Sequence, residues 1–173
     1  MQVYIVNGTG GCGKDTFAEF MYKHVPGTIK ISSIDRVKMI ARYCGWDGGK
    51  TEKDRKFLSD LKCLLTYYND LPFEYLQTAV RVYSRYDSTR ALLIDIREPE
   101  EIERAVKEFN ARTILIVNDR VPRIMSNMAD ANVFNYNYDV VIENNGTLED
   151  LEETVKRFAK SEGLIDECDA SAC

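Results

Sequence analysis

The sequence predicts an α/β fold in which helices flank a parallel β-sheet. Two observations favour this fold. Short apolar segments alternate with longer amphipathic segments along the chain, as repeated strand–helix units require. Two of the short segments, 91–94 and 113–117, are nearly continuous apolar runs, which is typical of strands buried on both faces of a parallel sheet. At 173 residues the chain is long enough for one domain with its own core.

The first strand, the loop after it and the first helix form a phosphate-binding motif. Residues 2–7 predict the strand, residues from about 14 to 25 predict the helix, and the glycine-rich loop between them has the spacing Gly-x-x-x-x-Gly-Lys. Glycines let successive backbone N–H groups point inward toward an anion, and the helix N-terminus adds the positive end of its dipole. Lys14 supplies a positive charge for the β- and γ-phosphates of a nucleotide. This P-loop predicts nucleotide binding by Gly8, Gly10, Gly11, Cys12, Gly13, Lys14, Asp15 and Thr16.

Two residues of this loop leave alternatives open. The position after Lys14, where a P-loop usually has a Ser or Thr that binds Mg²⁺, is Asp15, and Thr16 one step later can still reach an α-phosphate. Asp15 either binds Mg²⁺, directly or through water, or is only a favourable acid in the first helical turn. The thiol of Cys12, among helix N-terminal amides, is predicted to have a lowered pKa and to be alkylated unless ATP protects it. The simpler alternative is that Cys12 fills a position suited to Ser.

The second strand–helix unit contributes an acid at the same edge of the sheet. Thr28–Ile31 predict the second strand, and Ser33 is the expected N-cap of a helix with Asp35 in its first turn. Ligands of open α/β sheets bind beyond the carboxyl ends of the strands, which makes Asp35 a candidate catalytic residue. Residues 45–53 form a polar loop that is either a mobile lid or a connector. Two further helices are expected at about 57–68 and 73–86.

The third strand ends in a second acid. Residues 91–95 predict this strand, and Asp95 at its tip has the position of a Walker-B-type aspartate, near Mg²⁺ and the reacting phosphoryl group. Arg97 follows two residues later and points in roughly the same direction if the chain stays extended. The pair therefore predicts a catalytic site, with a salt bridge between the loop side chains as the alternative. Pro99 is expected at the first position of the next helix.

The last part of the chain predicts a lid, a fifth strand and a final helix. Arg120 and Arg123 follow the fourth strand, 113–117, where they suit a lid that closes on phosphates. Residues 139–143 predict the fifth strand. Thr147 with Asp150 resembles a capping box at the start of the final helix. We expect one domain over 1–160, with an insert at about 33–90, a lid at about 118–138 and a disordered tail over 161–173.

Taken in order, these motifs resemble the nucleoside monophosphate kinase group. The likeness is closest to its phage and bacterial deoxynucleotide monophosphate kinase and dephospho-coenzyme A kinase branches, and the Gly-Lys-Asp of the loop is also similar to animal-type phosphomevalonate kinases. The resemblance implies a P-loop NTPase fold with a five-stranded parallel sheet in the order 2-3-1-4-5, a helical acceptor-binding insert and a short lid. It rests on residues 8–16, Asp35 with Lys38, 94–97, 120–123 and 139–148.

Composition limits the partners. The net charge of −5 and the lack of a basic run argue against a protein that binds nucleic acid polymers, but not against single nucleotides. The five cysteines form no Cys-x-x-Cys pair, which favours reduced thiols and a cytoplasmic location. No apolar run approaches the ~20 residues of a membrane span. We expect a monomer or homodimer acting on a small nucleotide-like substrate.

The expected activity is phosphoryl transfer from ATP with Mg²⁺ to a small phosphorylated acceptor, a nucleoside or deoxynucleoside monophosphate. Lys14, Asp35, Asp95, Arg97, Arg120 and Arg123 are the candidate catalytic residues, and Asp15 and Asp95 the candidate metal ligands. The alternatives are a dephospho-coenzyme A or phosphomevalonate kinase and, from another class, a nucleotide-binding regulatory protein without transfer.

Overall fold

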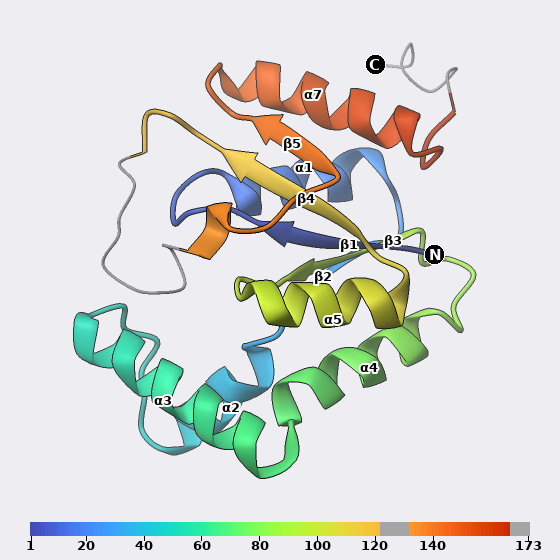
Figure 1. Cartoon of the computed structure of the whole chain (residues 1–173). Coiled ribbons are helices and arrows are strands. Elements are labelled where there is room, and N and C mark those ends of the chain that lie inside the picture. The colour runs from blue at the N-terminus through green and yellow to red at the C-terminus, as the bar shows by residue number, and fades with distance from the viewer. Residues whose placement is uncertain (122–131, 167–173) are drawn as a thin grey trace. The chain divides into compact units, whose positions relative to one another are not determined.

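The computed structural model describes residues 1–121 and 132–166 (Figure 1). Its centre is a five-stranded sheet in the order β2-β3-β1-β4-β5, which confirms the predicted order. β1 is parallel to β3 and β4, and β4 is parallel to β5. The strands are β1 (Gln2–Asn7), β2 (Thr28–Ser32), β3 (Ala91–Asp95), β4 (Arg112–Val117) and β5 (Val140–Glu143).

By contact the chain divides into two compact units, which are described separately. Unit 1 comprises Met1–Lys30 and Tyr86–Cys173, and unit 2 comprises Ile31–Arg85. The helices of unit 1 are α1 (Lys14–His24), α5 (Pro99–Phe109) and α7 (Leu148–Ser161), with a short 3₁₀ turn, η1 (Asn132–Phe134). The helices of unit 2 are α2 (Asp35–Tyr43), α3 (Glu52–Asn69) and α4 (Leu71–Tyr83).

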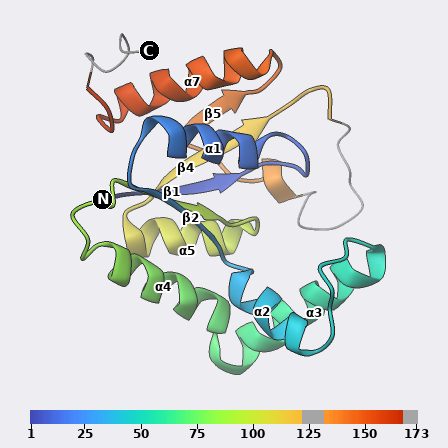
Figure 2. The ribbon, with the colours of Figure 1, turned by 180° about the vertical axis from the view of Figure 1, so that it is seen from behind.

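In unit 1 the helices cover both faces of the sheet. α1 and α7 lie on one face and α5 on the other (Figures 1 and 2). The core under α1 and α7 is apolar, and Phe158 of α7 is central to it: its ring lies 5.4 Å from that of Tyr4 and 5.9 Å from that of Phe17. Each large apolar side chain that is fully buried in this way stabilises the fold by about 1.5–3 kcal/mol. The layer therefore fixes α1, which begins at the P-loop.

The register of the strands determines which side chains reach the same edge. Val6 pairs with Asp95, so β1 and β3 end side by side. Because all these strands are parallel, the loops that follow them leave from the same edge of the sheet. This carboxyl edge contains the P-loop after β1 and Arg97 after β3.

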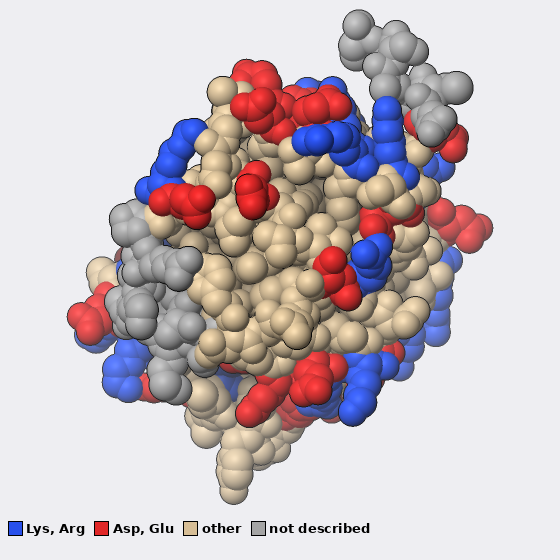
Figure 3. Space-filling model, turned by 45° about the horizontal axis from the view of Figure 1, so that its top comes forward, with Lys and Arg blue, Asp and Glu red and all other residues tan. Residues whose placement is uncertain are grey.

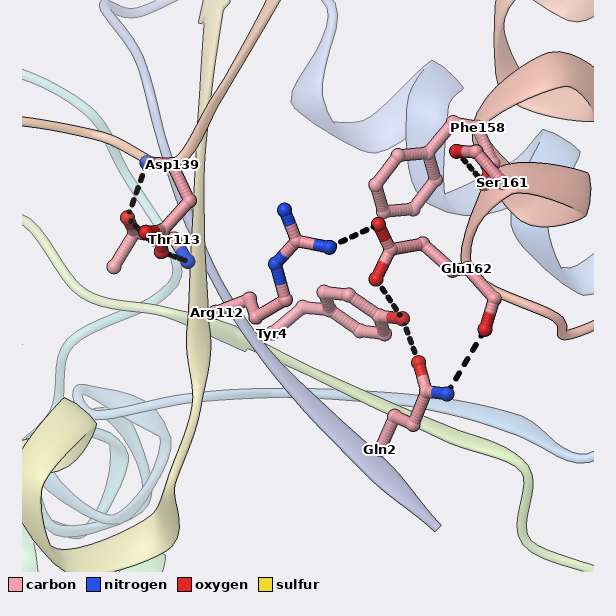
Figure 4. Close-up of polar contacts among 8 residues, drawn as sticks. All are labelled: Gln2, Tyr4, Arg112, Thr113, Asp139, Phe158, Ser161 and Glu162. Atoms are coloured by element: carbon pink, nitrogen blue, oxygen red, sulfur yellow. Dashed lines mark hydrogen bonds and ion pairs between the residues drawn. The ribbon is translucent and has the colours of Figure 1, made fainter.

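At the opposite, amino edge, polar side chains bond to one another (Figure 4). The buried Tyr4 hydroxyl lies 3.1 Å from Glu162 Oε2 and also contacts Gln2 Oε1, and Arg112 forms an ion pair with Glu162 Oε1. Burial, and then the Glu162 carboxylate, raise the pKa of Tyr4. The Gln2 amide donates to the Glu162 carbonyl oxygen at 2.9 Å. This network joins the chain after α7 to β1 and β4.

A second amino-edge pair closes the turn before β5. The Thr113 N–H and hydroxyl donate to Asp139 Oδ2 at 2.7 and 2.8 Å, and the Asp139 N–H donates back to the Thr113 hydroxyl at 2.9 Å (Figure 4). The capping box predicted at Thr147 and Asp150 is confirmed at the start of α7, and Pro99 is at the start of α5 as predicted.

Three local predictions differ from the structure. Ser33 is not the N-cap of α2: the cap position is Ile34, which makes no side-chain cap bond, and Asp35 Oδ2 instead accepts from the Ser32 N–H at 2.8 Å. The polar loop ends earlier than expected, because Thr51 and Asp54 form a capping box that starts α3 at Glu52. The chain stays packed beyond residue 161, since Leu164 is in the core of unit 1 and its carbonyl accepts from Arg90 at 2.8 Å.

The surface charge is mixed, as the lack of a basic run in the sequence predicts. On the face that Figure 3 shows, acidic and basic side chains are interspersed among uncharged ones and form no continuous basic surface. Among the residues that the structure describes, every helix is too short or too polar to span a bilayer.

Candidate active site

The P-loop conformation requires glycine at specific positions. Gly8, Gly11 and Gly13 have φ angles of 150°, 81° and 105°, a region that other residues rarely adopt. Space is also restricted, because a β-carbon at Gly8 would lie 2.4 Å from the Ile116 carbonyl oxygen and one at Gly13 would lie 2.4 Å from Asn144 Nδ2. The loop is thus tightly enclosed between β4 and the residues after β5, and Gly10 is the open position, with no atom within 4 Å of a β-carbon placed there.

Lys14 folds back over this loop. Its ammonium donates to the carbonyl oxygens of Gly8 at 2.6 Å and Thr9 at 2.8 Å, and lies 3.8 Å from Cys12 Sγ. Burial lowers the pKa of Lys14. Phosphate oxygens are charged and therefore make stronger acceptors than these carbonyls. The ammonium can exchange its loop partners for a phosphate group without leaving the loop.

Two of the predicted acids meet at one cation, Lys30 of β2. Its ammonium lies 3.1 Å from Asp95 Oδ2 and also forms an ion pair with Asp15 Oδ1. Burial disfavours the ammonium, but the bonds to the two carboxylates outweigh it and the pKa of Lys30 is raised. Burial also raises the pKa of Asp95, an effect that the Lys30 and Lys14 ammoniums partly offset. Asp95, at the tip of β3, is therefore a shielded acid beside the P-loop.

The same two carboxylates are candidate donors for a metal ion. The Lys30 ammonium shows that both carboxylates can reach one cation, and carboxylate oxygens suit Mg²⁺. Among residues 1–121 and 132–166, no group of three or more His, Cys, Asp or Glu side chains converges. Most of the remaining ligands of a Mg²⁺ ion would therefore be oxygens other than protein carboxylates, such as phosphate oxygens and water.

Asn7 connects three parts of the site and was missed in the sequence. It is 1% exposed at the end of β1, and its Oδ1 accepts from the Gly8 N–H at 2.8 Å. Its Nδ2 donates to the Arg97 carbonyl at 3.3 Å and to the Tyr138 hydroxyl at 2.8 Å. Burial raises the pKa of Tyr138 to about 12, and this protonated hydroxyl donates to the Val133 carbonyl at 2.8 Å. A polar residue at the end of an apolar strand, directly before the loop, was the available signal.

The turn after β5 supports the loop from the other side. Asn144 Nδ2 donates to the Cys12 carbonyl at 2.9 Å, and its N–H donates to the Val117 carbonyl at 2.8 Å. Asn145 is bonded to the segment after β4: its Oδ1 accepts from the Asp119 N–H at 2.9 Å, and its carbonyl accepts from the Arg120 guanidinium. Arg120 thus lies at the carboxyl edge on an exposed segment, whereas Arg123 lies outside the described residues.

The prediction of a lowered pKa at Cys12 is wrong. Its side chain is fully buried, and burial raises the pKa of the thiol more than the neighbouring Lys14 ammonium lowers it. Cys12 fills space under the loop, which agrees with the simpler alternative of a small residue at a Ser-like position.

The structure brings most of the predicted residues together in unit 1. Lys14, Asp15 and Thr16 begin α1, Asp95 ends β3, and Arg97 follows it. Asp35 belongs to unit 2, where its carboxylate bonds to the Ser32 N–H and is, after burial, the next cause of a raised pKa at Tyr75. Its catalytic role stays a prediction.

Comparison with known proteins identifies the fold. No protein-family model matches the chain, and no curated protein sequence matches it significantly. Among solved structures, the tunicamycin resistance protein of Deinococcus radiodurans is 12% identical, with a TM-score of 0.57 over 95% of this chain and 96% of that one. Shikimate kinase from Aquifex aeolicus vf5 is 13% identical, with a TM-score of 0.50 over 96% and 100%.

A third solved structure, dephospho-CoA kinase from Campylobacter jejuni, is 17% identical, with a TM-score of 0.50 over 92% of this chain and 96% of that one. The chain has the P-loop NTPase fold that these kinases share. At such low identities the likeness shows the fold alone, and any activity depends on the residues of the site.

Proposed function

We propose that this protein is an ATP-dependent kinase that phosphorylates a small phosphorylated acceptor, a nucleoside or deoxynucleoside monophosphate. The observation that carries the proposal is the position of the Lys14 ammonium, held 2.6 and 2.8 Å from P-loop carbonyls at the sheet edge where Asp95 ends β3. A P-loop accounts for nucleotide binding alone. Phosphoryl transfer also requires groups that bind the metal ion and the acceptor phosphate, and Asp95 and Arg97 would supply them.

The reaction is a substitution at the γ-phosphorus of ATP. An oxygen of the acceptor phosphate forms a bond to this phosphorus, the bond to the β–γ bridging oxygen breaks, and ADP leaves with the electron pair. Lys14 and the loop N–H groups neutralise the charge that develops on the β- and γ-phosphates. We assign the acceptor phosphate to Arg97, and closure over the transferred group to Arg120 and Arg123. A phosphate oxygen is already a nucleophile at neutral pH, so this reaction needs no strong base.

Asp15 and Asp95 would hold Mg²⁺ together with nucleotide oxygens and water. The ion, when bound, neutralises charge on the β- and γ-phosphates. In this scheme Asp95 keeps its ion pair with Lys30 through one oxygen. The more exposed Asp15 side chain can exchange Lys30 for the metal ion.

A second candidate is a kinase whose acceptor is a hydroxyl group, as a dephospho-coenzyme A kinase would be. The observation in its favour is the raised pKa of Asp95, because burial makes this carboxylate a better base for a hydroxyl proton. Asp35 is the other candidate base. A phosphomevalonate kinase would again use a phosphate acceptor and the first scheme.

The deciding experiment measures ADP release from ATP and Mg²⁺ across a panel of acceptors. The panel contains the ribonucleoside and deoxynucleoside monophosphates, dephospho-coenzyme A and phosphomevalonate. Stimulation by one or a few nucleoside monophosphates supports the proposal, and stimulation by dephospho-coenzyme A alone supports the hydroxyl acceptor. If no acceptor stimulates release while ATP still binds tightly, the proposed acceptor class is overturned, in favour of an acceptor outside the panel or of a nucleotide-binding regulatory protein.

A further inference from the structure

We propose that Lys30 is a positioning residue that keeps divalent metal away from Asp15 and Asp95 until nucleotide phosphates are present. In this view metal enters the site with the nucleotide and not before it. The inference rests on the proposed function only in naming the nucleotide as the ligand that accompanies the metal. No motif in the sequence identified Lys30, which lies within an ordinary strand.

Three residues of unit 1, each from a different element, meet at the Lys30 ammonium. Lys30 comes from β2, Asp15 from the first turn of α1 and Asp95 from the tip of β3. The ammonium lies 3.1 Å from Asp95 Oδ2 and forms its other ion pair with Asp15 Oδ1. It therefore lies between the two carboxylates, at the position that any cation shared by them would take.

Exposure distinguishes the two acids. The side chains of Lys30 and Asp95 are 18% and 23% exposed, whereas that of Asp15 is 91% exposed. The Lys30–Asp95 contact is thus shielded from water and salt, and the Lys30–Asp15 contact is not. Asp15 is the carboxylate that can exchange Lys30 for another partner at low cost.

Charge explains why metal alone would bind weakly. The two carboxylates of Asp15 and Asp95 carry two negative charges, and the Lys30 ammonium in contact with both offsets one of them. The net charge that attracts a divalent ion is therefore about half that of the two carboxylates alone. The described residues offer no third acid at this point. A nucleoside triphosphate adds several negative charges and phosphate oxygens, which is enough for both the ammonium and a metal ion in one site. Lys30 would thereby make metal binding depend on nucleotide binding.

The test is a nucleotide-free titration with Mn²⁺, monitored by the electron paramagnetic resonance signal of the free ion. The variants are Lys30→Met, which removes the charge but keeps an unbranched side chain, and Lys30→Arg, which keeps the charge. We expect Lys30→Met to bind one Mn²⁺ at least about tenfold more tightly than the wild type, because a positive charge in contact with the ligands is worth that much even in water. Lys30→Arg should bind as weakly as the wild type, and the double variant Lys30→Met/Asp95→Asn should lose the gain.

An affinity of Lys30→Met equal to that of the wild type would overturn the proposal, as would a gain that persists when Asp95 is also replaced. Circular dichroism confirms folding, and Lys30→Gln replaces Lys30→Met if the latter does not fold. A second titration adds a non-hydrolysable ATP analogue, and the difference between wild type and Lys30→Met should then shrink. The first titration uses neither nucleotide nor acceptor, so it gives an answer even if the acceptor panel shows no transfer.

Discussion

Two buried or partly buried polar side chains at opposite edges of the same sheet, Tyr4 and Lys14, have different kinds of partner. At the amino edge, Tyr4, Gln2, Arg112 and Glu162 bond to one another and to the chain after α7 (Figure 4). At the carboxyl edge, the Lys14 ammonium bonds only to carbonyls and a thiol of its own loop among its identified contacts, and that loop is built on glycines with positive φ.

The difference in partners predicts that the amino-edge contacts contribute to the stability of the fold and that Lys14 contributes to nucleotide binding. The amino-edge partners are side chains whose loss leaves a buried polar group without compensation, which costs stability. The loop carbonyls are partners that a phosphate group can replace, so removal of Lys14 should cost binding energy for the nucleotide and little stability. The comparison therefore predicts opposite effects of mutations at Tyr4 and at Lys14.

The largest effect is expected at Lys14. Lys14→Ala should lower kcat/KM with ATP by about a hundredfold or more, because it removes a cation from phosphates whose charge increases in the transition state. The midpoint of urea unfolding should shift little. Steady-state kinetics and urea unfolding measure the two quantities.

Lys23→Ala is the matched control for Lys14→Ala. Lys23 lies on the same helix, α1, and its exposed ammonium pairs with Glu152 at 2.7 Å, away from the loop. Its loss should leave turnover unchanged. Full activity in Lys14→Ala would refute the assignment of the loop, and a large loss of stability without loss of turnover would reverse the proposed difference between the edges.

Sequence reasoning succeeded where the signal was local. The P-loop, the Asp95 strand tip and the capping box at Thr147 each depend on neighbouring residues, and the structure has them where they were predicted. The strand order came from the resemblance to known kinases. The prediction of Ser33 as N-cap was wrong although it also depends on neighbouring residues. Asp35 Oδ2 accepts from the Ser32 N–H, and α2 begins at Asp35, one residue later than predicted.

Long-range contacts account for what was missed. Lys30 meets Asp95 across 65 positions of the chain, and Asn7 meets Tyr138 across 131, so neither contact has a signature in sequence spacing. Cys12 illustrates the same limit for electrostatics. The loop amides and Lys14 favour a thiolate and can be read from the sequence, but burial, which opposes it and dominates, depends on the packing of the whole sheet.

An intermediate effect is expected at Tyr4. Tyr4→Phe should lower the free energy of unfolding by about 1–2 kcal/mol at pH 7, because Glu162 and Gln2 lose the hydroxyl at a buried position. Activity per folded molecule should not change. Tyr67→Phe, at a tyrosine that is 92% exposed, is the control and should change neither quantity.

The pH dependence sharpens this prediction. The pKa of Tyr4 is raised in the folded protein by burial and by Glu162, so the stability it contributes is fully present below its ordinary pKa of 10.0 and is lost as the pH rises above that value. The difference in unfolding free energy between wild type and Tyr4→Phe should therefore shrink between pH 9 and 11, as measured by urea unfolding. A constant difference over this range would contradict the raised pKa.

The smallest effect is expected from chemical modification of Cys12. Its thiol is buried with a raised pKa, whereas Cys44 and Cys63 are exposed, so iodoacetamide at pH 7.5 should alkylate Cys12 at least about tenfold more slowly than either of them. Mass spectrometry of timed samples gives the three rates. Because Cys12 reacts only when the loop opens, ATP should slow its alkylation further if nucleotide closes the loop. Alkylation of Cys12 as fast as of Cys63 would mean that the loop is open in solution, and the close contacts of Lys14 with its carbonyls would then not describe the resting site.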